Sequence, residues 1–122
     1  TFIKQAASNK DLTVNGDGTQ TRSFCYIDDL IDGILKLMNH EYSYPINIGN
    51  DDEVTINEIA STLITILNSK SKIIYNKLPQ DDPLKRRPDL TLANEVLNWR
   101  PKVKKEVGFN LLIDYYKKNK FI

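Results

Sequence analysis

Residues 45–78, PINIGNDDEVTINEIASTLITILNSKSKIIYNKL, have the pattern of a strand, a helix and a second strand. The runs PINIG and KIIYNKL are short and apolar at several positions, as buried strands are. Between them, Thr55 and Glu58 have the spacing of a capping box, and apolar residues recur at helical intervals to about Asn68. Such a unit usually belongs to a parallel sheet with helices on its faces.

The segments on either side of this unit add more helices and short strands. On the N-terminal side, we predict the end of a helix over 1–8, a β-hairpin over 11–24 that turns at NGDG, and a helix from about Tyr26 to His40. On the C-terminal side, we predict a short helix over 90–97 and a last helix over 107–116. These strands are too few for a complete parallel sheet. Either a small mixed sheet forms, or the missing strands lie outside this chain.

The composition suits one globular domain and excludes several classes of function. The 122 residues include 17 basic and 16 acidic side chains, and the formal charge of +1 gives no general reason to expect nucleic acid or an anionic membrane as a partner. The single Cys25 excludes an intramolecular disulfide and a cysteine zinc site, and fits a reducing compartment. We predict no membrane segment and no signal peptide. Since the chain begins with Thr1 inside a predicted helix, we expect it to be part of a longer protein.

Few residues are obvious candidates for catalysis or metal binding. His40 is the only histidine, and its place at a predicted helix end favours a surface or capping role. The acidic groups, Asp28, Asp29 and Asp32 and the run 51–53, lack the spacing of a calcium loop, so we predict no metal site. The GDG turn also lacks the context of a phosphate-binding loop.

The arginines indicate a local anion site. Arg22 lies on a predicted strand, where it shares a face with Gln20. Arg86 and Arg87 precede a short helix. Cations at a helix N-terminus are electrostatically unfavourable because they oppose the helix dipole, and a bound anion would offset this unfavourable energy. The alternative is that the acidic residues at 81–82 neutralise the cluster as surface ion pairs. The residues alone leave both interpretations open, and the first places Arg22 and Arg86 in one anion-binding site.

Three stretches resemble the C-terminal part of extended short-chain dehydrogenase/reductases that act on nucleotide sugars, in the NAD-dependent epimerase/dehydratase family. They are LTVNGDGTQTRSFCYIDDLIDGILKLM (12–38), PINIGNDDEVTINEIA (45–60) and QDDPLKRRPDLTLANEVLNWRPKV (80–103). Their order is the one that the family has, and the resemblance covers nearly the whole chain. The QDDPLKRRPD stretch is most similar to the UDP-glucuronate decarboxylase (UDP-xylose synthase) branch.

The resemblance implies an α/β fold, that of the C-terminal fragment of an extended, Rossmann-type enzyme. Residues 1–122 would form the substrate-binding portion, and an N-terminal Rossmann domain that binds NAD would be absent from this chain. PINIG and the following helix would return to the Rossmann sheet as a late βα element. The hairpin and the QDDPLKRRPD region would cover the sugar nucleotide. The resemblance also implies a homodimeric parent enzyme, a cytoplasmic location (some eukaryotic relatives are luminal in the secretory pathway) and no cofactor for this chain alone.

The implied partner is a UDP-sugar. The parent enzyme would oxidise the C4 hydroxyl of UDP-glucuronate with NAD⁺, release CO₂ from the resulting β-keto acid and reduce the 4-keto pentose to UDP-xylose. Arg22 would reach the pyrophosphate, and Arg86 would serve as a catalytic residue, because its guanidinium can stabilise the enolate left by CO₂ loss. The implied substrate-binding residues are Thr13, Val14, Asn15, Gln20, Arg22 and Arg86. The alternatives are that the chain is part of another NDP-sugar enzyme, a 4-epimerase or a 4,6-dehydratase, or that it binds a sugar nucleotide without catalysis.

The sequence also departs from the family pattern. Asn15 stands where the family commonly has an aromatic residue, so we expect a weaker contact with the uracil base. The glycine-rich dinucleotide fingerprint is absent. We also expect no Tyr-x-x-x-Lys catalytic pair, since its spacing is not reproduced by Tyr115, Tyr116, Lys117 and Lys118. We therefore expect no NAD-dependent turnover from this chain alone.

Overall fold

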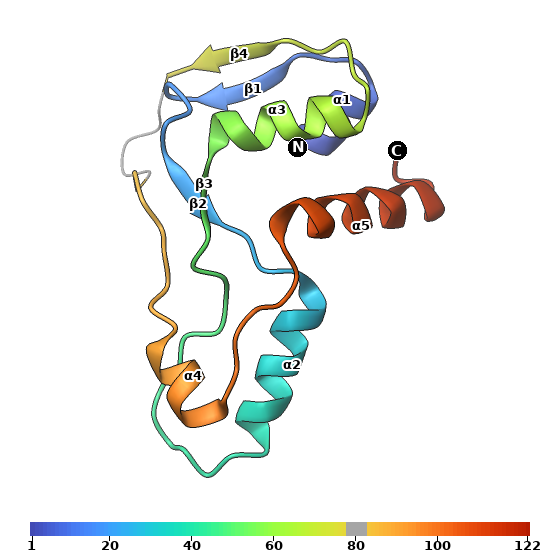
Figure 1. Ribbon diagram of the computed structural model, residues 1–122. Helices are drawn as coiled ribbons and strands as arrows, with labels where there is room; N and C mark the ends of the chain where they lie inside the picture. The colour runs from blue at the N-terminus through green and yellow to red at the C-terminus, as the bar shows by residue number, and fades with distance from the viewer. Residues whose placement is uncertain (78–82) are drawn as a thin grey trace.

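The computed structural model describes residues 1–77 and 83–122. Figure 1 shows a β1–β4 pair with α1 and α3 beneath it at one end of the molecule, α2 and α4 at the other end, and a β2–β3 pair between them. The elements are α1 Phe2–Ala7, β1 Leu12–Asn15, β2 Thr21–Ser23, α2 Ile27–Met38, β3 Glu53–Thr55, α3 Ile56–Ile66, β4 Ile73–Asn76, α4 Thr91–Leu97 and α5 Lys105–Lys118. Every predicted helix is therefore present.

The strands pair differently from the prediction. β1 and β4 run parallel, with Leu12 opposite Ile73, while β2 and β3 run antiparallel, with Arg22 opposite Val54. The predicted β-hairpin over 11–24 is wrong, because β1 and β2 belong to different pairs. β1 pairs with β4 instead of β2, and this pairing continues into the turn, where the Gly16 amide donates to the Asn76 carbonyl at 2.8 Å.

The predicted strand PINIG is also wrong. Residues 45–49 belong to no strand. Ile46 and Ile48 are instead half-buried by packing against the cluster of Leu90, Ala93, Leu97 and Trp99. The parallel pair that we expected around α3 does exist, but β1 takes the place of PINIG beside β4.

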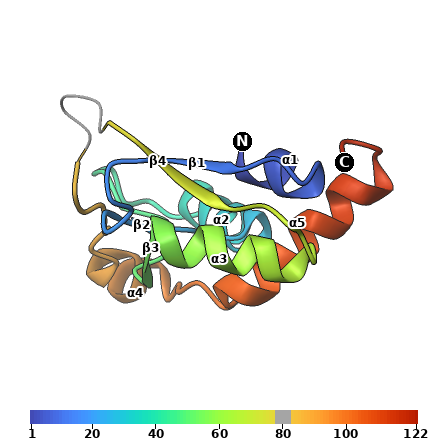
Figure 2. The same cartoon turned by 90° about the horizontal axis from the view of Figure 1, so that it is seen from above.

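Helix α3 begins at the predicted capping box and packs on both sides. The Glu58 amide donates to Thr55 Oγ1 at 3.1 Å, and the Thr55 amide donates to Glu58 Oε2 at 2.8 Å. One side of α3 places Ala60 against the buried residues of α1 and β1, and the other places Ile59 and Leu63 against α5. Seen from above, α3 lies alongside the β1–β4 pair with α5 nearby (Figure 2).

The segment 99–103, between α4 and α5, is held against α2 by Asp29. This buried carboxylate accepts from the amides of Lys102 and Val103 at 2.9 and 2.8 Å, and the Asp29 carbonyl accepts from Trp99 Nε1 at 3.2 Å. A Cβ at Gly33 would lie 2.5 Å from Ile48 and 3.0 Å from the indole of Trp99, so only glycine allows this approach. The segment that joins α4 to α5 is therefore fixed against α2.

Candidate anion-binding site

Residues 83–86 lie along β2 and bring the two arginine segments together. The Thr21 amide donates to the Leu84 carbonyl at 2.8 Å, and Arg22 Nη1 donates to the Pro83 carbonyl at 2.9 Å. Ser23 Oγ donates to the Arg86 carbonyl at 3.2 Å. Three consecutive residues of β2 thus hold the segment that carries Arg86, although the two lie far apart in the sequence.

Arg22 and Arg86 line one hollow of about 530 Å³. Its lining residues are Arg22, Ser23, Phe24, Cys25, Gly49, Asn50, Arg86, Arg87 and Pro88. Among the described residues, this lining includes three guanidinium groups and no carboxylate. The net charge of the chain is only +1, so three arginines on one hollow are a local group of cations among the described residues. Guanidinium groups suit phosphate and carboxylate ligands. Arg22 and Arg86 thus lie at the same hollow, and their binding of one anion stays a prediction.

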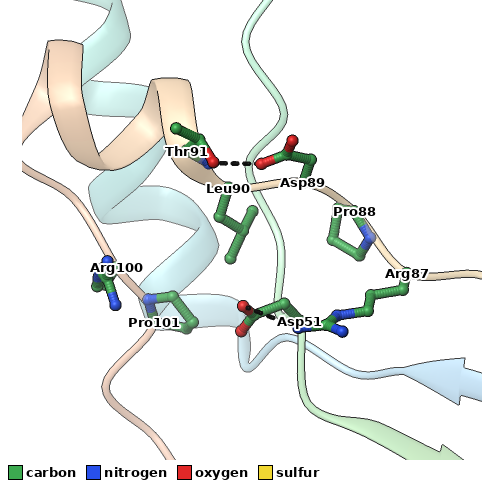
Figure 3. Close-up of a pocket in the computed structure, with 8 residues that line it drawn as sticks. All are labelled: Asp51, Arg87, Pro88, Asp89, Leu90, Thr91, Arg100 and Pro101. Carbon is green, nitrogen blue, oxygen red and sulfur yellow. Dashed lines mark hydrogen bonds and ion pairs between the residues drawn. The ribbon is translucent and has the colours of Figure 1, made fainter.

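A second hollow of about 550 Å³ adjoins the first, and the two share Arg87 and Pro88. Figure 3 shows Arg87 pointing toward Asp51, with Arg100 on the opposite side. The distance from Arg87 Nη2 to Asp51 Oδ2 is 3.7 Å. The alternative prediction, that the acidic residues at 81–82 neutralise the arginines, lies outside the described residues.

Asp89, at the edge of the second hollow, helps to start α4. Its Oδ1 accepts from the Thr91 amide at 2.9 Å. Hydrogen bonds from Thr91, the side chain first and then the backbone, lower the pKa of the Asp89 carboxyl below its ordinary value of 3.8. Asp89 is therefore ionised at neutral pH.

The other proposed substrate-binding residues lie near the turn after β1 and do not line the hollow with Arg22. Thr13 Oγ1 accepts from Gln5 Nε2 at 3.1 Å. The Val14 side chain is fully buried in the core, so only its backbone could meet a ligand. Asn15 is exposed, and its carbonyl accepts from the side-chain Nε2 of the buried Gln20.

The glycine turn has a structural explanation. Gly16 and Gly18 have φ values of 75° and 76°, which favour glycine. A Cβ at Gly18 would lie 2.0 Å from Asn57 Oδ1, because the Asn57 side chain closes over the turn and donates to the Asp17 carbonyl at 2.9 Å. The turn leads into β2 rather than into a helix. It therefore does not fit the pyrophosphate of a dinucleotide, for which a glycine-rich turn must open a helix.

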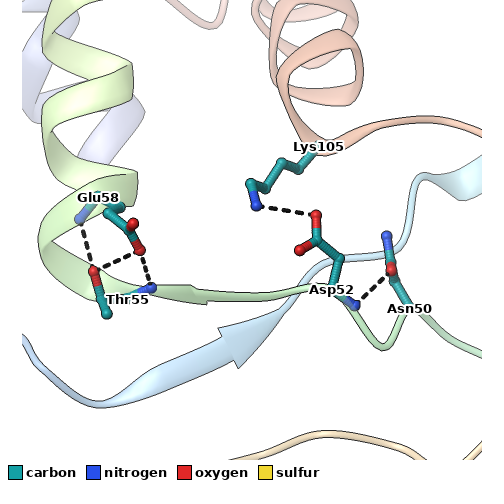
Figure 4. A network of polar contacts seen from close by, with 5 residues as sticks. All are labelled: Asn50, Asp52, Thr55, Glu58 and Lys105. Atoms are coloured by element: carbon teal, nitrogen blue, oxygen red, sulfur yellow. Dashed lines mark hydrogen bonds and ion pairs between the residues drawn. The ribbon is translucent and has the colours of Figure 1, made fainter.

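Sequence reasoning missed the side chains that complete the hollow. Asn50 is buried there, and its Oδ1 accepts from the Asp52 amide at 2.9 Å, while Asp52 itself binds Lys105 Nζ at 2.9 Å (Figure 4). Arg87 was noted in the sequence but was not among the predicted site residues. Asn50 could have been found from the sequence, because it ends NIGN (47–50) in a stretch that carries the family resemblance. Arg87 could have been found because it follows Arg86 directly.

Cys25 and His40 have ordinary environments. Burial, and then the charge of Asp29, raise the pKa of the Cys25 thiol above its ordinary value of 9.0, so it is protonated at neutral pH. His40 is exposed beyond the end of α2, and its Nδ1 accepts from the Tyr42 amide at 3.1 Å. The exposed position of His40 agrees with the surface or capping role that the sequence favoured for it.

Contrary to the expectation from the sequence, Tyr116 and Lys120 do have the Tyr-x-x-x-Lys spacing. However, α5 ends at Lys118, and Lys120 has a φ of 57°, in the left-handed region. The two side chains therefore do not follow one another along a helix face. The Tyr116 ring packs edge-on against Phe121 instead, with centroids 5.6 Å apart.

Two absences hold for residues 1–77 and 83–122, the part of the chain that the structure describes. No three His, Cys, Asp or Glu side chains in these ranges gather closely enough to hold a metal ion. No helix in the same ranges is both long and apolar enough to cross a membrane.

Comparison with known proteins gives matches in sequence and in structure. Residues 1–49 match the NAD dependent epimerase/dehydratase family. The chain is 47% identical over 111 residues to UDP-glucuronic acid decarboxylase 5 of Arabidopsis thaliana, a match that covers 91% of this chain and 33% of that relative. The chain thus spans about a third of the length of the curated relatives that it matches.

Solved structures agree over almost the whole chain. UDP-glucose 4-epimerase with UDP-glucose from Thermotoga maritima matches with a TM-score of 0.92 and 28% identity, over 98% of this chain and 38% of that one. UDP-glucuronic acid 4-epimerase from Bacillus cereus, in complex with UDP-glucuronic acid and NAD, matches with a TM-score of 0.88 and 33% identity, over 97% and 38%. By sequence and by fold, the chain belongs to the NAD dependent epimerase/dehydratase family.

Proposed function

We propose that this chain is the UDP-sugar-binding portion of a UDP-glucuronate decarboxylase-like enzyme, whose NAD-binding domain lies outside it. One observation carries the proposal: Arg22 and Arg86, from segments far apart in the sequence, line the same hollow. A diphosphate offers paired oxygens with about two negative charges, and two guanidinium forks match such a group. The similarity to a UDP-glucuronic acid decarboxylase supports the choice of sugar nucleotide.

The two arginines have separate roles in this proposal. The Arg22 guanidinium is held in place by the carbonyls of Thr21 and Pro83, and it would meet the pyrophosphate. Arg86 is exposed at the rim and would lie near the hexuronate. When the carboxylate of a 4-keto hexuronate leaves as CO₂, the electrons of the broken bond form an enolate. A permanently charged guanidinium nearby stabilises this enolate without proton transfer.

The uracil end would lie toward the turn after β1. Thr13, the Val14 backbone, Asn15 and Gln20 would line that part of the ligand. Gln20 joins the two parts of the site, because it precedes β2 and its side chain donates to the Asn15 carbonyl. A UDP-sugar would thus extend from the end of β1 along β2 to the hollow.

The described residues do not fit NAD. The only closely spaced glycines, Gly16 and Gly18, form a turn that Asn57 closes and that leads into a strand. We therefore assign no hydride-transfer step to this chain. Its own residues would bind the diphosphate and hold the sugar.

A 4-epimerase portion is the second candidate, because solved 4-epimerases match this chain closely in structure. The two functions differ in what they make from UDP-glucuronate. A decarboxylase releases CO₂ and forms a UDP-pentose, whereas a 4-epimerase retains the carboxylate and forms the C4 epimer. Formation of the C4 epimer without CO₂ by an enzyme that contains this chain would favour the second candidate.

Calorimetric titration with UDP tests the binding proposal. We expect heat of binding for the wild-type chain and a loss of about 1–3 kcal/mol in Arg22→Ala, the usual range for a hydrogen bond to a charged group. Arg86→Ala should also weaken binding, and it should leave the fold intact because the Arg86 side chain is exposed. Arg100→Ala removes the same charge from a side chain that binds Asn94 and does not line the first hollow, and it should bind UDP like the wild type. Absence of UDP binding by a folded wild-type chain, checked by circular dichroism, contradicts the proposal.

A further inference from the structure

Arg87 is the one arginine that lines both hollows. Arg22 and Arg86 line only the first, and Arg100 lines only the second. Arg87 therefore stands where the two spaces meet. A ligand that fills the first hollow and extends toward the second would pass this side chain.

The contact that Arg87 makes in the described structure is weak. Its Nη2 lies 3.7 Å from Asp51 Oδ2, which is beyond hydrogen-bond distance, and the two side chains are 58% and 50% exposed. Exposed ion pairs of this kind contribute little, because water screens the charges and two long side chains must be ordered. Asp51 therefore holds the Arg87 guanidinium loosely, and an anion on the hollow side can compete for it.

The neighbouring ion pair provides a contrast. Asp52 binds Lys105 at 2.9 Å, and the Lys105 side chain is only 25% exposed. The hydrogen bond to Asp52 raises the pKa of the Lys105 ammonium above its ordinary value of 10.5. Asp52 thus has a close partner, Lys105, which does not line the arginine hollow. The preceding carboxylate, Asp51, has a more distant partner, Arg87, which does line it.

The charges of the proposed ligand indicate what Arg87 meets. A UDP-uronate carries a diphosphate and, in addition, a carboxylate on the sugar. Arg22 and Arg86 match the diphosphate and the hexuronate ring, as proposed above. A third anionic group in the same hollow needs a third cation, and Arg87 is the remaining cation among the lining residues.

We propose that Arg87 selects the substrate by binding the carboxylate of a sugar-nucleotide uronate, and that Asp51 competes with this carboxylate for Arg87. This inference rests on the proposed function. Neither Arg87 as the residue that selects the substrate nor Asp51 as its competitor is among the site residues that the sequence predicted. UDP-glucuronate and UDP-glucose are the matched probes, because they differ only in a carboxylate or a hydroxymethyl group at C5 of the sugar.

Calorimetric titration of both probes into Arg87→Gln tests the proposal. We expect the dissociation constant for UDP-glucuronate to rise about tenfold, as for loss of one charge-assisted hydrogen bond, and that for UDP-glucose to change less than about twofold. Asp51→Asn removes the competitor, so it should tighten UDP-glucuronate binding about two- to threefold and leave UDP-glucose unchanged. Lys105→Gln, which removes the cation of the neighbouring ion pair, should alter neither constant.

The outcomes separate the two proposals. If Arg87→Gln weakens both probes equally, Arg87 binds the diphosphate and the specificity proposal is wrong. If it weakens neither, Arg87 does not meet the ligand, and the proposal is again wrong while UDP-sugar binding stands. If the folded wild-type chain binds neither probe nor UDP, the proposed function itself is wrong. Circular dichroism of each variant excludes misfolding as the cause of a loss.

Discussion

Helices α2 and α3 have similar lengths and amphipathic sequences, but their apolar faces have different surroundings. Helix α3 buries Ile59, Ala60 and Leu63 between the β1–β4 pair and α5. Helix α2 buries only Asp29 and Gly33. Its large apolar side chains that remain 43–74% exposed are Ile27, Ile31, Ile34, Leu35 and Met38. Periodicity in a sequence thus identifies an apolar helix face, but it does not show what covers that face.

The largest expected difference between the two helices is the cost of removing a leucine side chain. Leu63→Ala should lower the free energy of unfolding by about 2–5 kcal/mol, because Leu63 is 2% exposed and its removal leaves a cavity. Leu35→Ala in α2 should cost less than about 1 kcal/mol, because Leu35 is 52% exposed. Urea denaturation measures both values. Equal costs would show that the face of α2 is covered in solution.

An intermediate effect is expected where α2 is anchored by a polar contact. Asp29→Ala leaves the amides of Lys102 and Val103 without their carboxylate partner, and should lower the free energy of unfolding by about 1–3 kcal/mol. Asp28→Ala is the matched control, since Asp28 is exposed on the same helix turn. If the two variants lose the same stability, the Asp29 contacts do not anchor α2.

The smallest expected effect is a pH dependence at the start of α3. Hydrogen bonds from Thr55, the backbone first and then the side chain, lower the pKa of the Glu58 carboxyl below its ordinary value of 4.5. Because the folded-state pKa is the lower one, this stabilisation is present above pH 4.5 and is lost as the pH falls through the folded-state value. Glu58→Gln should therefore be less stable than the wild type at pH 6, with a smaller difference at pH 3. Denaturation midpoints at the two pH values measure this, and a constant difference would contradict it.

Local signals in the sequence predicted the helices well. The capping box of Thr55 and Glu58 and the apolar periodicity placed α3 correctly, since both depend on neighbouring residues. Strand pairing was predicted less well. Strands of three or four residues carry little information about their partners, and the glycine turn suits a hairpin as well as the observed connection. Only the tertiary structure shows that β1 pairs with β4.

The candidate site was predictable in part. Arg22 and Arg86 stood out as cations without a clear local function, and the family resemblance joined them. The contact between Arg87 and Asp51 could not be predicted, because it depends on how the segment after α2 passes the segment before α4. Asn50 was missed for a similar reason, since its burial arises from the same tertiary contact.

The hydrogen bonds that join β2 to residues 83–86 also affect the entropy of binding. The Arg22 guanidinium already donates to two carbonyls, so much of its rotamer freedom is lost when the chain folds rather than when a ligand binds. Arg86 is exposed, and among the described residues its one hydrogen bond joins its backbone carbonyl to Ser23 Oγ. Its side chain would become ordered only on binding. The hollow thus combines one cation in a fixed position with one that can adjust to the ligand.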